Sequence, residues 1–438
     1  MRFHLTKFIV LLLTFFSFAC EQRSPQENKT TDSPVAKDST SHNFYVPARK
    51  ITQGPQHHWF GYYDKLEFDP TNRYVLSNQV VFEGRSPKED DMIKVGMVDL
   101  QNNDQWIELG ESKAWNWQQG SMLQFIPGST NEVIWNDRQK GKFVSHLKNI
   151  ESGEIRTLPF PIYTLHPDGK QALSVDFERI NDTRPGYGYA GIPDPNKNVM
   201  TPGDAGIYLA NLETGEKKLI ISIADMMKLP LPESDEASFE DYKTKKHWFN
   251  HLLFSPSGDR FIFLHRWESP SKSNVGGFGT LMYTADISGK DIRLVDASGY
   301  SSHFIWQDDK HILVWTKLND KGGFYLFEDS EGNNVELLGE GIMTVNGHQS
   351  YLPGNKWLVN DTYPDESRYQ HLYLFNVETN EKIPLSDLYL APEYKGEWRV
   401  DTHPRFSRDG KFIVVDGQDK NEGRQLFLME IDHLIDPI

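Results

Sequence analysis

The stretch at 251–264, HLLFSPSGDRFIFL, recurs at 403–416 as HPRFSRDGKFIVVD. Each copy has a short apolar run, a turn built on Ser, Asp and Gly, and a second apolar run, a pattern typical of a β-hairpin. Looser copies occur five more times, at 65–78, 122–137, 162–176, 303–315 and 348–361. Regular self-similarity of this kind indicates a fold built from repeated units.

Further strand pairs lie between these hairpins, such as 206–220 and 371–385, and both contain the turn sequence N-x-E-T-x-E-K. Two hairpins per unit, repeated seven times, predict an all-β fold: a seven-bladed β-propeller with four-stranded antiparallel blades. A pair of β-sandwiches is the alternative, and the repeat period argues against it. A helical apolar period is almost absent, although 220–244 has room for one short helix. The longest insert, 180–246, is expected between the third and fourth units.

The N-terminus has the features of a bacterial lipoprotein signal peptide. Residues 1–20 read MRFHLTKFIVLLLTFFSFAC, with Arg2 and Lys7 before an apolar run and with Ala19 just before Cys20. This predicts a signal peptide at 1–19, a flexible tether at 20–44 that carries lipidated Cys20, and a β-propeller catalytic domain at 45–438. The apolar run is too short to span a bilayer. We therefore expect a lipid anchor at the outer membrane, and an ordinary secretory signal with an incidental cysteine is the alternative.

Composition excludes several kinds of site and partner. The 438 residues carry a formal net charge of −16, which disfavours nucleic acid as a partner. Cys20 is the single cysteine, so neither an intramolecular disulfide nor a multi-cysteine zinc site can form. An anionic substrate would need a local cationic cleft. We expect the protein to act as a monomer.

Four consecutive hairpin copies carry histidine at the same position. In a propeller the first strand of each blade lines the central channel, so equivalent positions form a ring at one depth. Converging imidazoles with a neighbouring amide oxygen suit a divalent metal such as Mn²⁺, Zn²⁺ or Ca²⁺. The alternative is that the histidines are core residues beside a water-filled channel. The candidate ligands are His251, His303, His348, Gln349 and His403.

Aromatic, amide and charged side chains cluster just before several hairpins. Such mixtures suit sugar rings, which have apolar faces and polar edges, although aromatics also pack between blades. The candidate substrate-binding residues are Tyr62, Tyr63, Asn136, His247, Trp248 and Arg399. A loop rich in Gly and Pro at 184–189 and the end of a second strand add candidate catalytic groups. These are Arg184, Tyr187, Tyr189 and Arg266, together with His251.

Seven stretches together resemble a known group of enzymes. They are HHWFGYYDK, WNWQQG, RPGYGYAG, KHWFNHLLFSP, SSHFIW, NGHQSYLPG and WRVDTHPRFSRDGK, and they cover most of 50–420. The chain resembles the seven-bladed propeller polysaccharide lyases, namely the oligogalacturonate lyases and ulvan lyases. The resemblance implies β-elimination at a uronic acid of a pectic or ulvan-type polysaccharide or oligosaccharide.

The resemblance also implies roles for the candidate residues. His303, His348, Gln349 and His403 match the metal ligands, and His251 matches either a ligand or the catalytic histidine. Arg184 or Arg266 would neutralise the substrate carboxylate, and Tyr187 or Tyr189 would transfer a proton. The histidine pair of ulvan lyases has no counterpart, because no histidine lies between His58 and His146.

Two other functions remain open from the sequence. One is a non-catalytic glycan-binding propeller at the cell surface. The other is a glycoside hydrolase, which needs two suitably spaced carboxylates, for which Asp64, Asp361, Asp401 and Asp416 are available.

Overall fold

A computed structural model describes residues 41–232, 239, 241–269, 277–332 and 334–435. These residues all belong to one compact unit. The proposed signal peptide, Cys20 and most of the proposed tether lie outside them. In the part of the chain that is described, no helix is both long enough and apolar enough to cross a membrane.

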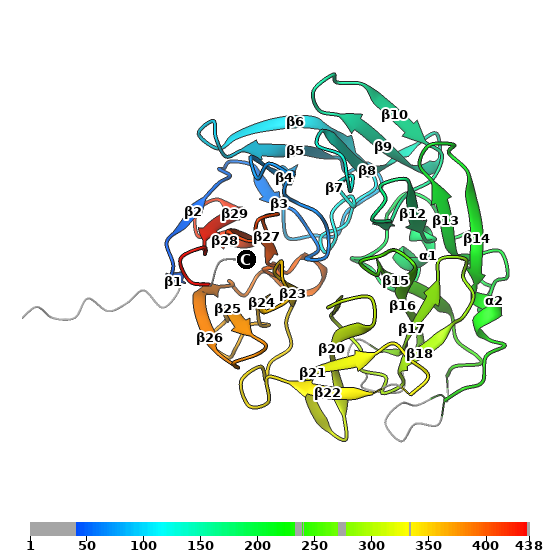
Figure 1. The fold of residues 1–438 in the computed structure, drawn as a ribbon. Coiled ribbons are helices and arrows are strands. Elements are labelled where there is room, and N and C mark those ends of the chain that lie inside the picture. The colour runs from blue at the N-terminus through cyan, green and yellow to red at the C-terminus, as the bar shows by residue number, and fades with distance from the viewer. Residues whose placement is uncertain (1–40, 233–238, 240, 270–276, 333, 436–438) are drawn as a thin grey trace, which may run out of the picture. The chain divides into compact units, whose positions relative to one another are not determined.

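The described strands form seven antiparallel sheets that follow one another around a ring (Figure 1). In the first three blades the strands follow chain order. Blade 1 contains β3 (His57–Trp59), β4 (Tyr74–Val80), β5 (Ile93–Asp99) and β6 (Gln105–Ser112). Blade 2 contains β7 (Gln124–Phe125), β8 (Glu132–Gln139), β9 (Lys142–Asn149) and β10 (Ile155–Leu158), and blade 3 contains β11 (Thr164–Leu165), β12 (Gln171–Ser174), β13 (Gly206–Asn211) and β14 (Lys217–Ser222).

The next two blades follow the same order: blade 4 is β15 (His247–Phe254), β16 (Arg260–Glu268), β17 (Phe278–Asp286) and β18 (Arg293–Asp296); blade 5 is β19 (Phe304–Trp306), β20 (His311–Leu318), β21 (Lys321–Glu328) and β22 (Val335–Leu338). Blade 6 contains β23 (Ser350–Tyr351), β24 (Trp357–Asn360), β25 (Tyr369–Asn376) and β26 (Lys382–Tyr389), and blade 7 contains β27 (Arg405–Phe406), β28 (Phe412–Asp419) and β29 (Gly423–Glu430). This arrangement confirms the predicted seven-bladed propeller with four-stranded antiparallel blades.

The N-terminal segment completes the last two blades. β1 (Asn43–Phe44) adds a fifth, outer strand to blade 6 by pairing with β26, and β2 (Ala48–Lys50) pairs with β29 as the outer strand of blade 7. Blade 7 is therefore built from both ends of the described chain, which closes the ring. The propeller begins at β1, inside the segment that the sequence assigned to the tether.

The two strongest repeat copies fold as predicted into the hairpins β15–β16 and β27–β28. In the first, the amide of Gly258 donates to the carbonyl of Ser255 over 2.9 Å and closes the turn. Gly258 has a φ of +84°, and a Cβ atom there would lie 2.0 Å from the imidazole of His166 in blade 3. Glycine is thus required both by the turn and by the close approach of the neighbouring blade.

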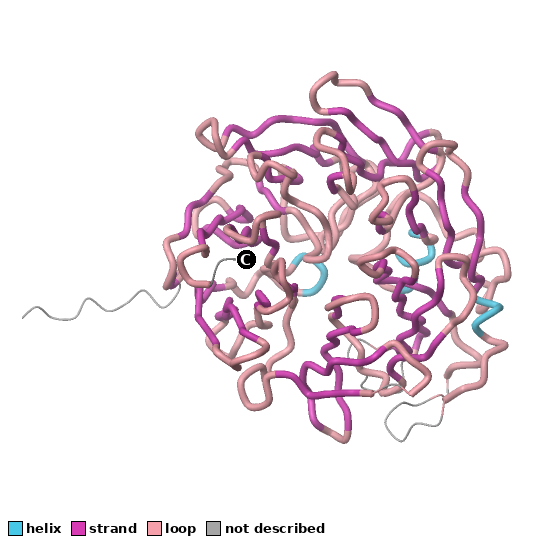
Figure 2. Tube along the Cα trace, viewed as in Figure 1, coloured by secondary structure: helices cyan, strands magenta, loops and turns pink. Residues whose placement is uncertain are grey.

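Helices are few and short in the described residues (Figure 2). They are α1 (Phe177–Thr183), α2 (Ile223–Met226) and the 3₁₀ turn η1 (Gly396–Trp398). α2 confirms the short helix expected within 220–244. The segment 180–246, expected as an insert between the third and fourth units, contains the strand pair predicted at 206–220, and β13 and β14 divide it. One part, with α1 and the loop after it, lies within blade 3, and the other joins blade 3 to blade 4.

Candidate functional site

Two tyrosines from blade 1 reach into the centre of the ring. The two residues are Tyr62 and Tyr63. The carboxylate of Asp416 accepts hydrogen bonds from the amides of Phe60 and Gly61, at 3.0 and 3.3 Å, and so fixes the backbone just before the tyrosines. The hydroxyl of Tyr63 donates to the carbonyl of Phe304 in blade 5 and accepts from its amide, at 2.8 and 2.9 Å. The Tyr63 side chain thereby links blade 1 to blade 5 across the channel.

Tyr62 lies among the histidines that the repeat predicted. Its ring centroid is 5.1 Å from those of both His251 and His403. The centroids of His303 and His348 lie 4.0 Å apart, and those of His348 and His403 lie 4.3 Å apart. Three of the four imidazoles thus form one cluster, whereas the ring contacts of His251 are with Tyr62 and Tyr187.

The carboxylate of Asp361 orients His348, the middle imidazole of this cluster. Its carboxylate oxygens lie 2.9 and 3.0 Å from Nδ1 of His348, and they accept the backbone amides of His348 and His403 at 2.7 and 3.2 Å. Since Nδ1 of His348 is occupied, Nε2 is the atom left for a further partner. A carboxylate that holds one ring nitrogen in this way is the usual support for a metal-binding histidine.

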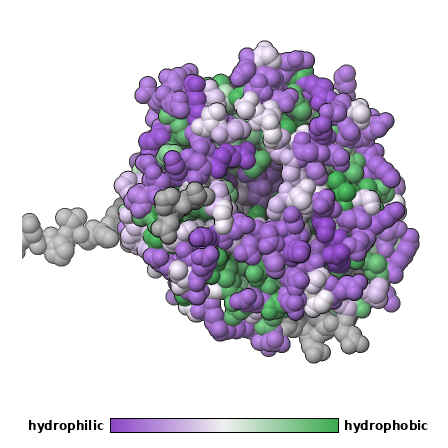
Figure 3. All heavy atoms as spheres, viewed as in Figure 1, coloured by the Kyte–Doolittle hydropathy of each residue, from purple (hydrophilic) through white to green (hydrophobic). Residues whose placement is uncertain are grey.

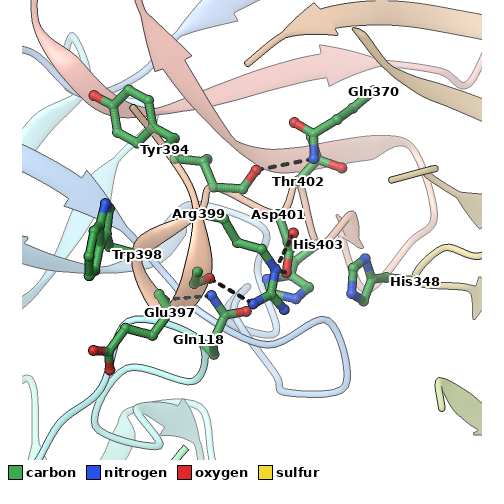
Figure 4. Close-up of polar contacts among 12 residues, drawn as sticks. Gln118, His348, Gln370, Tyr394, Glu397, Trp398, Arg399, Asp401, Thr402 and His403 are labelled. Atoms are coloured by element: carbon green, nitrogen blue, oxygen red, sulfur yellow. Dashed lines mark hydrogen bonds and ion pairs between the residues drawn. The ribbon is translucent and has the colours of Figure 1, made fainter. Parts of the chain in front are cut away.

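The strongest metal-site geometry is formed by His348, Asp401 and His403, whose potential ligand atoms all lie within 4.8 Å of one another. Figure 4 shows these three side chains together, with Arg399 directed at Asp401. Nε2 of His403 and Oε1 of Gln349, the residue that follows His348, are buried and have no hydrogen-bond partner among the described residues. Buried polar atoms normally have partners, so two orphaned acceptors here fit a bound cation.

The electrostatic environment keeps the clustered histidines in the form that binds metal. Burial, and then the neighbouring His348, lower the pKa of His303 and of His403 well below the usual value. Both imidazoles are therefore neutral near pH 7, and a neutral ring nitrogen is required for coordination. Nδ1 of His303 donates to Oδ1 of Asn346 over 2.9 Å, so its Nε2, which has one long contact of 3.5 Å with Oγ of Ser302, is the nitrogen left to accept or to bind a ligand.

His251 lines a cavity of about 350 Å³ beside the cluster, which we call the site cavity. Figure 3 shows a hollow near the centre of one face of the ring, with mostly hydrophilic residues around it. His251 has a φ of +54° where the pairing of β15 with β16 shifts register. Its Nδ1 is buried without a partner in the described chain. Burial, and then Arg266 and Arg184, lower the pKa of His251 well below its usual value, so the imidazole is neutral near pH 7 and one of its nitrogens is a free base.

The site cavity holds two guanidinium groups that have no carboxylate partner in the described chain. Its described lining includes Arg184 and Arg266 but neither Asp nor Glu, and the third cation of the lining, Lys317, pairs with Asp320 at 2.7 Å. Arg266 is 4% exposed and bonds only the neutral side chains of Thr280 and Asn250, at 3.2 Å each. Both guanidinium groups also pack on the ring of Phe278, at 4.4 Å for Arg184 and 4.6 Å for Arg266. Burial, and then the charge of Arg184, lower the pKa of Arg266 to about 9.

Tyr187 lies in the same cavity and is suited to giving up a proton. Its ring is 5.3 Å from that of His251, and its hydroxyl oxygen accepts from Nη2 of Arg399 over 3.3 Å. Burial raises the pKa of Tyr187, but the charges of Arg399 and Arg184 outweigh burial and lower it overall. Because Arg399 supplies a donor, the hydroxyl proton of Tyr187 points to another acceptor.

Several predicted site residues lie outside both the cluster and the site cavity. Nδ2 of Asn136 donates to the hydroxyl of Tyr189, at 2.9 Å, and to the carbonyl of Ile162. Tyr189 also stacks on Phe177, with centroids 4.2 Å apart. His247 uses Nδ1 with His265 and Nε2 with the carbonyl of Tyr242. Trp248 is buried against Phe278.

The structure adds residues that the sequence did not assign to the site. Asn346 and Tyr363 line the site cavity, and Tyr163 holds the amide of His251 over 2.8 Å. The sequence offered Asp361 and Asp401 as carboxylates for a hydrolase, and Asp401 also as an oxygen donor near the histidines. The orienting role of Asp361 gives no signal in the sequence, because it joins His348 to His403 of the next blade.

Comparison with known proteins shows a shared fold without close sequence similarity. No protein-family model matches the chain, and no curated protein matches it. An oligogalacturonate lyase solved in complex with manganese has 15% sequence identity and a TM-score of 0.61, over 89% of this chain and 96% of that one. Oligogalacturonate lyase from Vibrio parahaemolyticus has 13% identity and a TM-score of 0.58 over the same shares. A Mycobacterium tuberculosis puromycin-hydrolyzing peptidase has 13% identity and a TM-score of 0.50, over 87% of this chain and 55% of that one.

Proposed function

We propose that this protein is a lyase that cleaves a uronic-acid-containing saccharide by β-elimination. The observation that carries the proposal is the site cavity, in which two guanidinium groups without carboxylate partners face a neutral histidine and a tyrosine. In a protein of net charge −16, such a cavity selects an anionic group from solution. Similarity to the two oligogalacturonate lyases supports the proposal at the level of fold.

The chain's own residues can perform the reaction in one active site. Arg266 and Arg184 pair with the C5 carboxylate of the uronate, which makes the C5 proton more acidic. A ring nitrogen of neutral His251 takes that proton as a base and later releases it to solvent. The electrons of the C5–H bond form the C4=C5 double bond, and the bond from C4 to the glycosidic oxygen breaks. The hydroxyl of Tyr187 protonates the leaving oxygen and later regains its proton from solvent.

A divalent cation at His348, Asp401 and His403 would complete the site. We propose manganese as the first metal to test, because the oligogalacturonate lyase with the higher TM-score was solved in complex with it. Bound there, the cation would withdraw negative charge from the substrate carboxylate. Gln349, whose buried Oε1 has no partner in the described chain, and His303, which belongs to the histidine cluster, would serve as additional ligands.

The site cavity gives no support to a glycoside hydrolase, because its described lining contains no carboxylate pair. A glycan-binding propeller without catalysis remains the alternative outcome of the activity test. We further propose a monomer held at the outer membrane by a lipid on Cys20, with an acidic polysaccharide or oligosaccharide as its partner. Labelling the whole chain with a fatty-acid analogue, with Cys20→Ser as the comparison, tests this anchor.

The test of activity is the ultraviolet absorbance of the unsaturated product during incubation with pectic, ulvan and alginate-type substrates. The informative variants are Tyr187→Phe and Tyr189→Phe, which remove the same atom from neighbouring positions of one loop. We expect Tyr187→Phe to lower kcat about 100-fold or more, since it removes the acid, and Tyr189→Phe to stay within a few-fold of the unaltered protein. No product from any uronate substrate would refute the lyase, and saturable binding without product would establish the binding protein instead.

A further inference from the structure

A second, larger cavity lies at the opposite end of the channel. In each of blades 4 to 7 the inner strand runs from the histidine toward the hairpin turn, and this cavity of about 450 Å³ is lined at those turns by Pro256, Asp308 and Asn355. These three residues are exposed, so the cavity opens to solvent. We call it the turn-side cavity. Its lining has no residue in common with that of the site cavity.

The tyrosine segment lies between the two cavities. Tyr62 lines the site cavity and Tyr63 lines the turn-side cavity. The double hydrogen bond of the Tyr63 hydroxyl to the backbone of Phe304 holds this segment in place. A ligand of the turn-side cavity would therefore occupy a site separate from the proposed reaction.

Two buried residues that line the turn-side cavity carry hydroxyl groups without a partner in the described chain. Oγ of Ser350 and the hydroxyl of Tyr351 both belong to lining residues, and these residues are only 3% and 6% exposed. A buried hydroxyl without a hydrogen bond costs about 1–3 kcal/mol, so native proteins rarely keep two together unless a ligand or water meets them. This pair points to a ligand that both donates and accepts hydrogen bonds.

The charges of the turn-side cavity are almost balanced, in contrast to those of the site cavity. Lys65 pairs with Asp64 at 2.8 Å, and Arg405 pairs with Glu67 at 2.7 Å. The remaining charged groups of the described lining are Arg408 and the carboxylates of Asp308 and Asp309. The net charge of the described lining is therefore slightly negative, so the cavity would weakly repel an anionic ligand and would accept a neutral one.

The side chains that line the turn-side cavity indicate what kind of ligand it would bind. Trp306, Tyr351 and Phe406 supply aromatic and apolar surface beside the hydroxyl, amide and carboxylate groups. Aromatic faces beside polar groups suit a pyranose ring, and the volume is within the range of small-molecule sites, roughly 300–1,000 Å³. We infer that the turn-side cavity is a non-catalytic binding site for a neutral pyranose unit.

The test uses saturation-transfer NMR and titration of the full-length protein with methyl glycosides of glucose, galactose, mannose and rhamnose. Galacturonic acid serves as the acidic probe. We expect at least one neutral glycoside to bind, and we expect Ser350→Ala and Tyr351→Phe each to raise its Kd about 5- to 10-fold, the effect of losing one hydrogen bond.

The matched control is Ser386→Ala, which removes another buried, unpartnered hydroxyl of blade 6 that lies outside the cavity. It should leave the Kd unchanged. Thermal unfolding of all three variants should match or exceed that of the unaltered protein, because an unpartnered hydroxyl adds nothing to stability. Three results would overturn the inference: no neutral glycoside binds, binding is the same in Ser350→Ala and Tyr351→Phe, or galacturonic acid competes for the same site. None of these results bears on the lyase reaction, which is measured separately.

Discussion

Replacing Arg266 with glutamine should weaken substrate binding and stabilise the protein at the same time. The guanidinium is buried, its hydrogen-bond partners are neutral, and a second guanidinium lies on the same phenylalanine ring. A buried charge without a counterion costs several kcal/mol, and the glutamine removes that cost while keeping a polar group near Asn250 and Thr280. We expect a net gain of about 1–2 kcal/mol in the free energy of unfolding.

The effect on binding has the opposite sign. At an effective dielectric constant of about 20, two charges about 4 Å apart attract by about 4 kcal/mol, and a hydrogen bond to a charged group contributes about 1.5–3 kcal/mol. A loss of about 2–4 kcal/mol corresponds to an affinity for a uronate oligosaccharide about 30- to 1,000-fold weaker. The two quantities are measured by denaturant unfolding and by calorimetric titration with trigalacturonate.

The control is Arg73→Gln, which changes the net charge equally at a residue paired with Asp99 on blade 1. It should alter stability and affinity by little. If Arg266→Gln lowers stability and leaves affinity unchanged, Arg266 is a structural residue and the reasoning about the cationic cavity is refuted.

Three further predictions concern the metal cluster, pH and ring closure. His403→Ala and Asp401→Asn should lower metal affinity about 10-fold or more, measured by elemental analysis after dialysis against Mn²⁺, whereas His311→Ala at the start of β20, outside the cluster, should not. Burial raises the pKa of the Glu67 carboxyl from 4.5 to about 7, even though the charge of Arg405 lowers it. Between these two pH values the folded protein keeps a proton on Glu67 that the unfolded chain releases. Stability should therefore fall as pH rises from about 4.5 to about 7, by up to about 3 kcal/mol, and Glu67→Gln should lack this component in thermal unfolding. Deleting residues 1–50 removes β1 and β2 and should lower the unfolding midpoint by several degrees or prevent folding, and an unchanged midpoint would contradict the proposed ring closure.

The fold was predictable because its information is local. Each hairpin repeats a turn between two apolar runs, and the same steric needs recur at each copy, as at Gly258. The histidine column could be predicted for the same reason, since equivalent positions in repeated units occupy equivalent places around the channel. Two of the five predicted ligands, His348 and His403, belong to the compact cluster.

The remaining geometry depends on contacts that no repeat encodes. Tyr63 meets Phe304 across the ring, and Asp361 joins His348 to His403 through bonds between two blades. His247 shows that a residue close to a site residue in the sequence can face away from the site. It stands in an aromatic segment near His251, yet both of its ring nitrogens bond to protein groups away from the site cavity. Spacing along the chain does not distinguish a side chain that faces the channel from one that faces its own blade.

The way in which the ring closes also determines how the protein would respond to a mechanical load. Residues 43–50 attach to the outermost edges of blades 6 and 7, through β1 on β26 and β2 on β29. His348 and His403 stand beside the innermost strands, at the opposite edge of the same two sheets. A pull on the N-terminal end would be borne in shear by the rim strands, and two or three intervening strands would shield these two histidines from the force.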